Sequence, residues 1–228
     1  MDNHTIQHAG LSINDLFKPG NTIAWDFLCQ FTWPWEALPL ISSFIAEIGA
    51  GLDASEYEKR PDNVWIHKSA SVAASAFVGK SVIIDAGAEV RHCAFIRENA
   101  LIGKNSVVGN STELKNVILF DEVQTPHYNY IGDSILGYKS HTGAGAITSN
   151  VKSDRTLITV RCGEDRIDTG LKKFGAILGD HVEIGCNSVL NPGSVIGLGS
   201  TVYPLSSVRG FVPAGSIYKK QGEIAKKR

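Results

Sequence analysis

Polar side chains that could carry acid–base and anion-binding chemistry occur between residues 97 and 150. His127 lies in the run Pro126–Asp133, and an imidazole can act as a general base near neutral pH. A purely structural loop histidine is the alternative. Arg97 and Lys115 are 18 residues apart. If the fold brings these two cations to the same side of the molecule, they would form a site for an anion such as phosphate. The alternative is that both are solvated surface charges.

A run of small residues follows, from Thr142 to Asn150. Small side chains let a ligand approach the backbone closely, and they also allow tight packing at a turn. The run therefore predicts either a ligand groove or a packed corner.

A sixfold repeat must position these groups. Aliphatic residues recur every sixth position in two stretches, at Ile66, Val72, Val78, Ile84, Val90, Ile96, Ile102, Val108 and Leu114, and again at Leu178, Ile184, Leu190, Ile196, Val202 and Val208. This period fits neither an α-helix nor a long strand, but it fits short strands joined by tight turns. Three repeats make a triangular coil of about 18 residues whose neighbours stack about 4.8 Å apart. The sequence therefore predicts an all-β parallel β-helix in which Arg97 and Lys115 stack on one face.

Two interruptions and two ends depart from the repeat. Its phase slips between Leu119 and Ile131, and residues 149–176 leave it. Such loops carry function or are tolerated surface insertions. Residues 1–64 are predicted to form a partly helical cap, with a short helix over 39–49, because a solenoid exposes its first coil. Substrate contact and subunit contact are the alternative roles for this segment. We expect the β-helix domain to span 65–214 and a basic tail to span 215–228.

Composition excludes several classes of function. The net charge of −1 argues against a general nucleic-acid binder. The four cysteines form no CxxC pair, which argues against a structural zinc site and a disulfide framework. The first residues lack the pattern of a signal peptide, and no apolar run reaches about 18 residues. These features predict a cytoplasmic protein without a membrane partner.

The polar motifs resemble a known family. Glu113–Lys115, His127–Asp133 and Gly143–Asn150 occur in the order and at the spacing of the C-terminal acetyltransferase domain of bifunctional glucosamine-1-phosphate N-acetyltransferase / UDP-N-acetylglucosamine pyrophosphorylases. The segment Thr169–Gly175 looks closer to archaeal-type sugar-1-phosphate nucleotidylyltransferases that carry the same domain. The resemblance covers about residues 66–215.

The resemblance implies a left-handed coil, a homotrimer and acetyl-CoA as co-substrate, with no metal needed for the transfer. It implies His127 as the proton acceptor for an amino sugar phosphate. The substrate contacts implied are Arg97, Lys115, Tyr130 and Lys173, with His141 at a further substrate position. The coenzyme contacts implied are Ala144, Asn150, Cys186, Pro204 and Lys219.

Departures from the family pattern leave alternatives open. His141 stands where the family has an asparagine, and Cys186 replaces the usual serine. Residues 1–63 are too short for a nucleotidylyltransferase domain, so no pyrophosphorylase activity is expected of this chain. Acyl transfer to another sugar and a non-catalytic sugar-nucleotide-binding module remain open. A γ-type carbonic anhydrase is disfavoured because the histidines lack the spacing of a zinc site.

Overall fold

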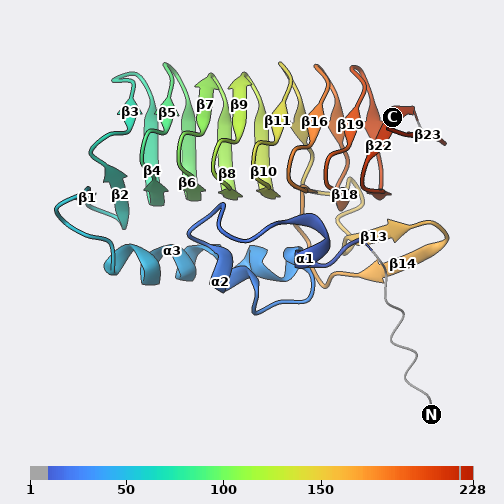
Figure 1. Ribbon diagram of the computed structural model, residues 1–228, viewed down its shortest axis with the longest axis horizontal. Helices are drawn as coiled ribbons and strands as arrows, with labels where there is room; N and C mark the ends of the chain where they lie inside the picture. The colour runs from blue at the N-terminus through green and yellow to red at the C-terminus, as the bar shows by residue number, and fades with distance from the viewer. Residues whose placement is uncertain (1–9, 221, 228) are drawn as a thin grey trace, which may run out of the picture.

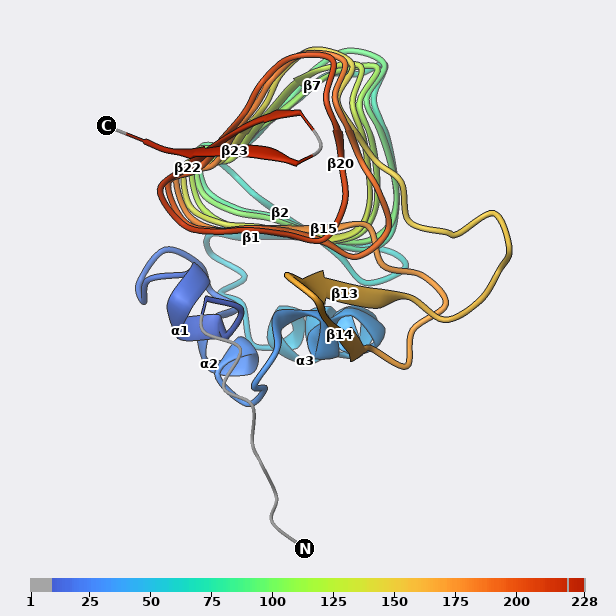
Figure 2. The ribbon, with the colours of Figure 1, turned by 90° about the vertical axis from the view of Figure 1, so that its right-hand side faces the viewer.

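Stacked parallel coils form a triangular prism. The computed structural model describes residues 10–220 and 222–227, and Figures 1 and 2 show the coils from the side and from one end. Face 1 is one nine-stranded sheet in the order β23-β22-β19-β16-β11-β9-β7-β5-β3. Its strands are β3 (Ser71–Val72), β5 (Glu89–Val90), β7 (Val107–Asn110), β9 (Gln124–His127), β11 (His141–Thr142), β16 (Glu183–Ile184), β19 (Thr201–Val202), β22 (Ser216–Lys220) and β23 (Glu223–Lys226).

Long strands that bend at a corner supply the other two faces. Each carries a residue with positive φ at its middle, for example Asn116 at +56° and Asp133 at +46°, and Asn and Asp tolerate this conformation better than most residues. The bent strands are β4 (Phe77–Ile84), β6 (Phe95–Ile102), β8 (Glu113–Leu119) and β10 (Tyr130–Leu136). Face 2 holds their first halves with β12 (Ile147–Thr148), β17 (Val189–Leu190) and β20 (Ser207–Val208). Face 3 holds β2 (Val64–His67), their second halves, β15 (Ala176–Leu178), β18 (Ser194–Ile196) and β21 (Phe211–Val212).

The predicted parallel β-helix is confirmed. The aliphatic residues at sixfold spacing from Ile84 to Leu114 and from Leu178 to Val208 are buried inside the coils. Val72 and Val78, in the first coils, are only half-buried. The left-handed sense of the coil stays a prediction from the family resemblance.

The coil length changes earlier than the sequence suggested. Phe95 pairs with Glu113 at a spacing of 18, but Glu98, and not Arg97, pairs with Lys115. The spacing of 17 then continues, because Lys115 pairs with Gly132. Arg97 is the extra residue of a β-bulge, so the prediction that Arg97 and Lys115 stack in register is wrong.

Face 3 is apolar on its outside as well as its inside. Its outward row is fully buried and consists of Ile83, Leu101, Ile118, Ile135, Ile177 and Val195. Strands buried on both sides read as continuous apolar runs, as in Val82–Ile84 and Val117–Leu119. This row therefore requires a covering layer along the whole prism.

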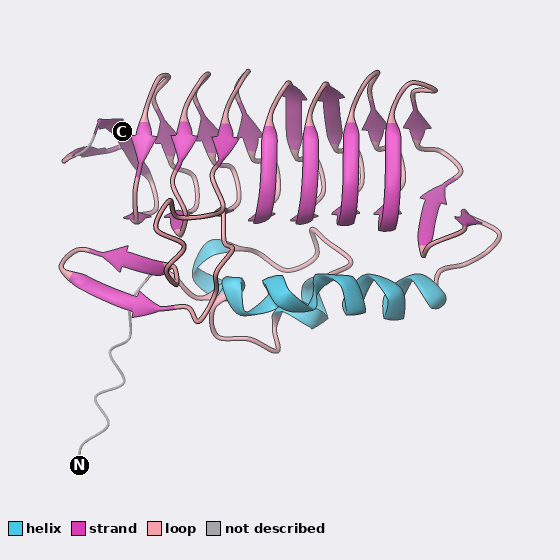
Figure 3. Ribbon diagram, turned by 180° about the vertical axis from the view of Figure 1, so that it is seen from behind, coloured by secondary structure: helices cyan, strands magenta, loops and turns pink. Residues whose placement is uncertain are grey.

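The predicted N-terminal helical segment is present, and its helices form that layer along face 3 rather than covering only the first coil. They are α1 (Ile13–Leu16), α2 (Trp25–Leu28), the 3-10 helix η1 (Pro34–Leu40) and α3 (Ile41–Ala50). Figures 2 and 3 show them running beneath face 3 along the prism. Phe17 packs on Phe120 with ring centroids 4.8 Å apart, and Trp35 packs 5.9 Å from Phe174. The antiparallel pair of β1 (Tyr57–Arg60) and β2 lies at the N-terminal end instead.

The insertion and the tail are both structured. The insertion forms an antiparallel hairpin, β13 (Thr159–Cys162) and β14 (Asp165–Asp168), which lies beside the helices beneath face 3 (Figure 2). The tail was predicted to be a basic extension. Instead β22 continues face 1, and β23 folds back on it antiparallel across the C-terminal end of the prism.

Asp180 ties the N-terminal segment to the coils. Its buried carboxylate accepts hydrogen bonds of 2.8 Å from the backbone N–H groups of Lys18 and Tyr138. We expect Asp180→Ala to lower the free energy of unfolding by about 2 kcal/mol, because both donors lose their partner. Denaturant unfolding would measure this loss. Asp168→Ala, at an exposed carboxylate, is the control, and an equal loss in both variants would contradict the account.

Candidate functional site

One corner between face 1 and face 2 collects most of the predicted coenzyme residues. Backbone hydrogen bonds place His127, Ala144, Cys186 and Pro204 in successive coils: Gly145 N–H donates to the carbonyl of His127, Asn187 N–H to that of Ala144, and Leu205 N–H to that of Cys186. Two further residues, His92 and Asn110, continue the row toward the N-terminus. We call this row the His127 corner.

The backbone around His127 is held rigidly while its side chain is exposed. His127 ends β9, and its N–H donates to Asn129 Oδ1 at 3.1 Å. Asn129 is buried, and its Nδ2 donates to the carbonyl of Gly143 at 2.8 Å. An exposed imidazole on a fixed backbone can accept a proton from a bound amine.

The glycine run at this corner serves close packing between coils. A Cβ on Gly143 would lie 2.6 Å from the backbone nitrogen of Cys186, so any side chain there would push the coils apart. The packed-corner interpretation therefore holds for Gly143. Ala144 and Cys186 remain at the surface. Beside them, Tyr128, Tyr203 and Leu205 expose 59%, 45% and 79% of their surface, which provides an apolar border to the corner.

Tyr130 lies at the start of face 2, three residues after His127. Burial, followed by the charges of Asp133 and Glu113, raises the pKa of its phenol. The hydroxyl therefore stays protonated at neutral pH and can donate a hydrogen bond. The hydroxyl lies over Gly132, since a Cβ added to Gly132 would come within 2.6 Å of it.

Lys115 and Asn150 belong to a buried network around Asp133. Lys115 Nζ donates to the two carboxylate oxygens of Asp133 at 3.1 and 3.3 Å, and the side chains of Lys115 and Asp133 are only 13% and 5% exposed. The amide nitrogens of Asn116 and Asn150 also donate to this carboxylate. Because its charge is already neutralised and mostly buried, Lys115 is poorly placed to hold a substrate phosphate.

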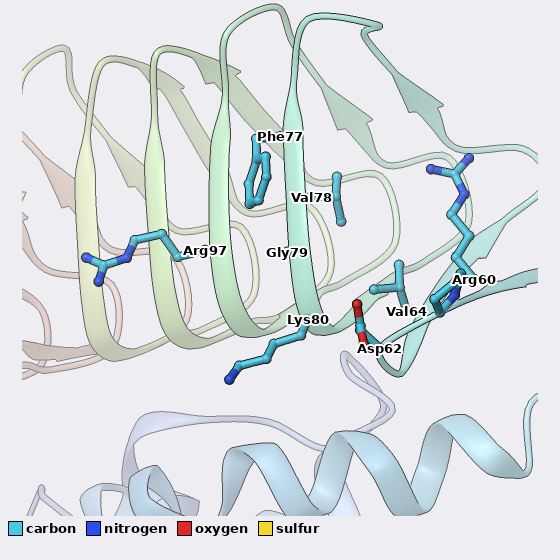
Figure 4. Close-up of a pocket in the computed structure, with 9 residues that line it drawn as sticks. Arg60, Asp62, Val64, Phe77, Val78, Gly79, Lys80 and Arg97 are labelled. Atoms are coloured by element: carbon cyan, nitrogen blue, oxygen red, sulfur yellow. The ribbon is translucent and has the colours of Figure 1, made fainter.

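Arg97 is exposed and lines a cavity of about 560 Å³ near the N-terminal end of face 2. Arg60 and Lys80 line the same cavity, but Figure 4 shows the three side chains pointing away from one another. Ion pairs hold all three: Arg60 with Glu58 at 2.8 Å, Lys80 with Glu98 at 3.7 Å and Arg97 with Glu113 at 2.9 Å. The cavity therefore lacks converging free cations.

The remaining predicted residues lie apart from this group. His141 projects from face 1, where its Nδ1 lies 2.8 Å from Glu183 Oε2. Lys173 is exposed at the end of the insertion. Lys219 pairs with Glu223 at 3.4 Å in the C-terminal hairpin.

The sequence analysis did not predict the roles of Glu113 and Asp133. Both stand in the polar motifs, but neither received a role. The signal available was the 17-residue spacing of Asn99, Asn116, Asp133 and Asn150. Carboxylate and amide side chains at that spacing form a hydrogen-bonded ladder along one corner.

Neither a metal cluster nor a membrane helix is found in the part of the chain that the structure describes. Residues 10–220 and 222–227 contain no group of three His, Cys, Asp or Glu side chains that could hold a metal ion. No helix in these residues has the length and apolar character needed to cross a membrane.

Relatives of known sequence share about half of the chain. The bifunctional sugar-1-phosphate nucleotidylyltransferase/acetyltransferase of Sulfurisphaera tokodaii is 33% identical over 109 residues, which cover 48% of this chain and 27% of the relative. The bifunctional protein GlmU of Methanococcus vannielii is 34% identical over 120 residues, covering 52% and 29%. The matched region thus spans between a quarter and a third of each relative. These matches confirm the resemblance inferred from the motifs.

Two solved structures share the coil at low identity. The acetyltransferase domain of PglB from Neisseria gonorrhoeae is 17% identical with a TM-score of 0.36, covering 80% of this chain and 63% of that one. A mutant of AntD, an N-acyltransferase from Bacillus cereus, is 22% identical with a TM-score of 0.33, covering 73% and 82%. Both TM-scores are below 0.5, so neither similarity supports a conclusion about function.

A family model gives the assignment. The model described as the GMPPB C-terminal domain matches residues 80–198, which are just over half of the chain. The match begins within β4 and includes the whole of β6, β8 and β10, the His127 corner from His92 to Cys186, and the whole insertion. On this match the chain belongs to the family of the GMPPB C-terminal domain.

Proposed function

We propose that this protein transfers an acetyl group from acetyl-CoA to the amino group of a sugar phosphate resembling glucosamine-1-phosphate, with His127 as general base. The observation that carries the proposal is the His127 corner, where an exposed imidazole stands in one row with Ala144, Cys186 and Pro204. The family resemblance assigns those three residues to the coenzyme. The relative from Sulfurisphaera tokodaii is itself named as a bifunctional nucleotidylyltransferase and acetyltransferase.

The reaction is a direct transfer. Acetyl-CoA lies along the His127 corner with its thioester near His127. A ring nitrogen of His127 takes a proton from the amino group as the amine nitrogen attacks the thioester carbonyl carbon. A C–N bond forms, the C–S bond breaks, and the leaving thiolate receives the proton from the imidazolium. Tyr130, protonated at neutral pH, donates a hydrogen bond to the sugar.

Arg97 is the cation that we propose for the sugar phosphate. Its side chain is 42% exposed and its partner Glu113 is 31% exposed, so the pair is weak and can exchange for a phosphate. Lys115 instead positions the corner through Asp133. Asn150 acts with Lys115 in that network, and Lys173 remains a proposed substrate contact at the surface.

Arg97→Gln is expected to raise the KM for the amino sugar phosphate about tenfold and to leave the free energy of unfolding nearly unchanged. The reason is the loss of a charged hydrogen bond to phosphate. Steady-state kinetics would measure it. Lys80→Gln removes a neighbouring exposed cation and should leave KM unchanged. Equal effects in both variants would contradict the assignment of Arg97.

The proposed function is tested by thiol release from acetyl-CoA with a panel of acceptors. Purified protein would be given amino sugar phosphates, nucleotide-linked amino sugars and the corresponding sugars without an amine. Release with amino sugar phosphates alone supports the proposal. Release only with nucleotide-linked acceptors or sugar hydroxyls would move the function to another acyl acceptor. Sugar-nucleotide binding without thiol release would identify a non-catalytic module.

Assembly is part of the proposal. A homotrimer with sites between neighbouring prisms is what the family resemblance implies, and it stays a prediction. Light scattering at several protein concentrations would measure the mass of the assembly.

A further inference from the structure

A second cavity lies on the opposite side of face 2 from the His127 corner. It has a volume of about 420 Å³, and its polar lining includes Ser149, Lys152, Ser153, Asp154, Arg161 and Arg209. A smaller cavity adjoins it and shares Lys152, Arg161, Pro192 and Arg209. The insertion therefore borders an open cavity against the C-terminal coils.

The walls of this cavity are fixed by backbone contacts. Arg161 belongs to β13. A Cβ added to Gly210 would lie only 2.6 Å from the carbonyl oxygen of Arg161. A Cβ on Gly193 would likewise lie 2.8 Å from Ile158 Cγ2. Gly193 and Gly210 also have φ values of +80° and +78°. Both the close approach and the positive φ therefore favour glycine at these two turns. The hairpin is thus packed closely on the coils, with Ile158 and Val160 fully buried.

Three cations from different parts of the chain line this cavity. Lys152 comes from the start of the insertion, Arg161 from the hairpin and Arg209 from the turn after β20. Lys152 Nζ is oriented by the carbonyl of Leu157 at 2.7 Å. Within residues 10–220 and 222–227, no carboxylate lies within ion-pair distance of these three cations.

One carboxylate offsets part of this charge. Asp154 also lines the cavity, but its Oδ1 accepts hydrogen bonds from the N–H and the hydroxyl of Thr156 at 2.9 and 2.8 Å. These hydrogen bonds, and to a smaller degree the charge of Lys152, lower the pKa of Asp154. The balance at the cavity is three cations to one carboxylate. This differs from the cavity beside Arg97, where every cation has a carboxylate partner.

We propose that this cavity binds the phosphate or diphosphate group of a small metabolite. Two guanidinium groups offer paired N–H donors that match phosphate oxygens, and a lysine adds a third positive charge. Ser149, Ser153 and Thr159 supply hydroxyl groups for the remaining oxygens or for an attached sugar. The volume lies in the range of small-molecule sites. The inference does not depend on acetyl transfer, since the cavity contains no residue of the His127 corner.

Pyrophosphate is the primary probe for the test, with binding measured by calorimetry on the full chain. We expect wild-type protein to bind it, and both Arg161→Gln and Arg209→Gln to weaken binding about tenfold or more. Arg155→Gln is the matched control, because Arg155 belongs to the same insertion and is exposed but does not line the cavity. This control should bind like wild type. Melting curves would verify that each variant is folded.

Competition identifies the source of the phosphate. Glucose-1-phosphate, UDP and coenzyme A would be tested separately for displacement of pyrophosphate. Displacement by one of them supports the site and names a sugar phosphate, a nucleoside diphosphate or the coenzyme. The proposal is overturned if wild-type protein does not bind pyrophosphate, or if Arg155→Gln weakens binding as much as Arg161→Gln. Displacement by none of the three would overturn the assignment to a metabolite.

Discussion

His127→Ala should lower the turnover of acetyl transfer by about 10²–10⁴-fold, which is the usual contribution of general-base catalysis. The amine would still bind beside the thioester but would have no group to take its proton. Because the imidazole is exposed and its ring supports no packed core, the variant should fold normally. Coenzyme binding should change little, since the backbone of the corner depends on Asn129.

The matched control for His127→Ala is His92→Ala. His92 lies in the same corner two coils earlier and is also exposed. It should leave turnover unchanged. Turnover of His127→Ala equal to wild type, or an equal loss in both variants, would remove His127 from the mechanism. Initial rates at saturating acetyl-CoA provide the comparison.

Asp133→Ala should lower the free energy of unfolding by about 3–5 kcal/mol, the cost of leaving a buried charge without its partner. Lys115 would lose both carboxylate oxygens, and the amides of Asn116 and Asn150 would lose their acceptor. Glu113→Ala is the contrasting variant. It breaks the exposed pair with Arg97 and should cost at most about 1 kcal/mol.

Two further variants separate charge from backbone effects at Asp133. Asp133 has a φ of +46°, which asparagine adopts more readily than alanine, so Asp133→Asn removes the charge with less backbone strain. Combining it with Lys115→Met should recover part of the loss, because no charge is then left unpaired. Guanidinium unfolding measures all four proteins. Equal costs for Asp133→Ala and Glu113→Ala would contradict a buried network.

The sixfold rhythm predicted the coil because interior packing imposes one large aliphatic residue per strand. Ile84, Val90 and Ile96 are buried for that reason. The rhythm could not reveal the bulge at Arg97, because residues 117–120 are all apolar and therefore fit a spacing of 17 or of 18 equally well. The assumed spacing of 18 therefore placed Arg97 beside Lys115, whereas the structure pairs Glu98 with Lys115.

The sequence contains a signal that predicts where the N-terminal helices pack. Ile83, Leu101 and Ile118 are apolar although an outward position on a single-sided sheet would be polar. These residues lie between the sixfold positions, so the sixfold repeat alone does not include this second apolar row. The ion pairs of Arg97 and Lys115 were harder to foresee, because they depend on which carboxylates the folded coils bring within reach.

The most direct measurement of the central claim is thiol release from acetyl-CoA with glucosamine-1-phosphate compared with glucose-1-phosphate. The two acceptors share the phosphate and the ring but differ at the nucleophile. We predict saturable release with the amine, with mass spectrometry showing one acetyl group on its nitrogen, and no release with the hydroxyl analogue. Release at equal rates with both acceptors, or with neither, would contradict the proposed N-acetyl transfer.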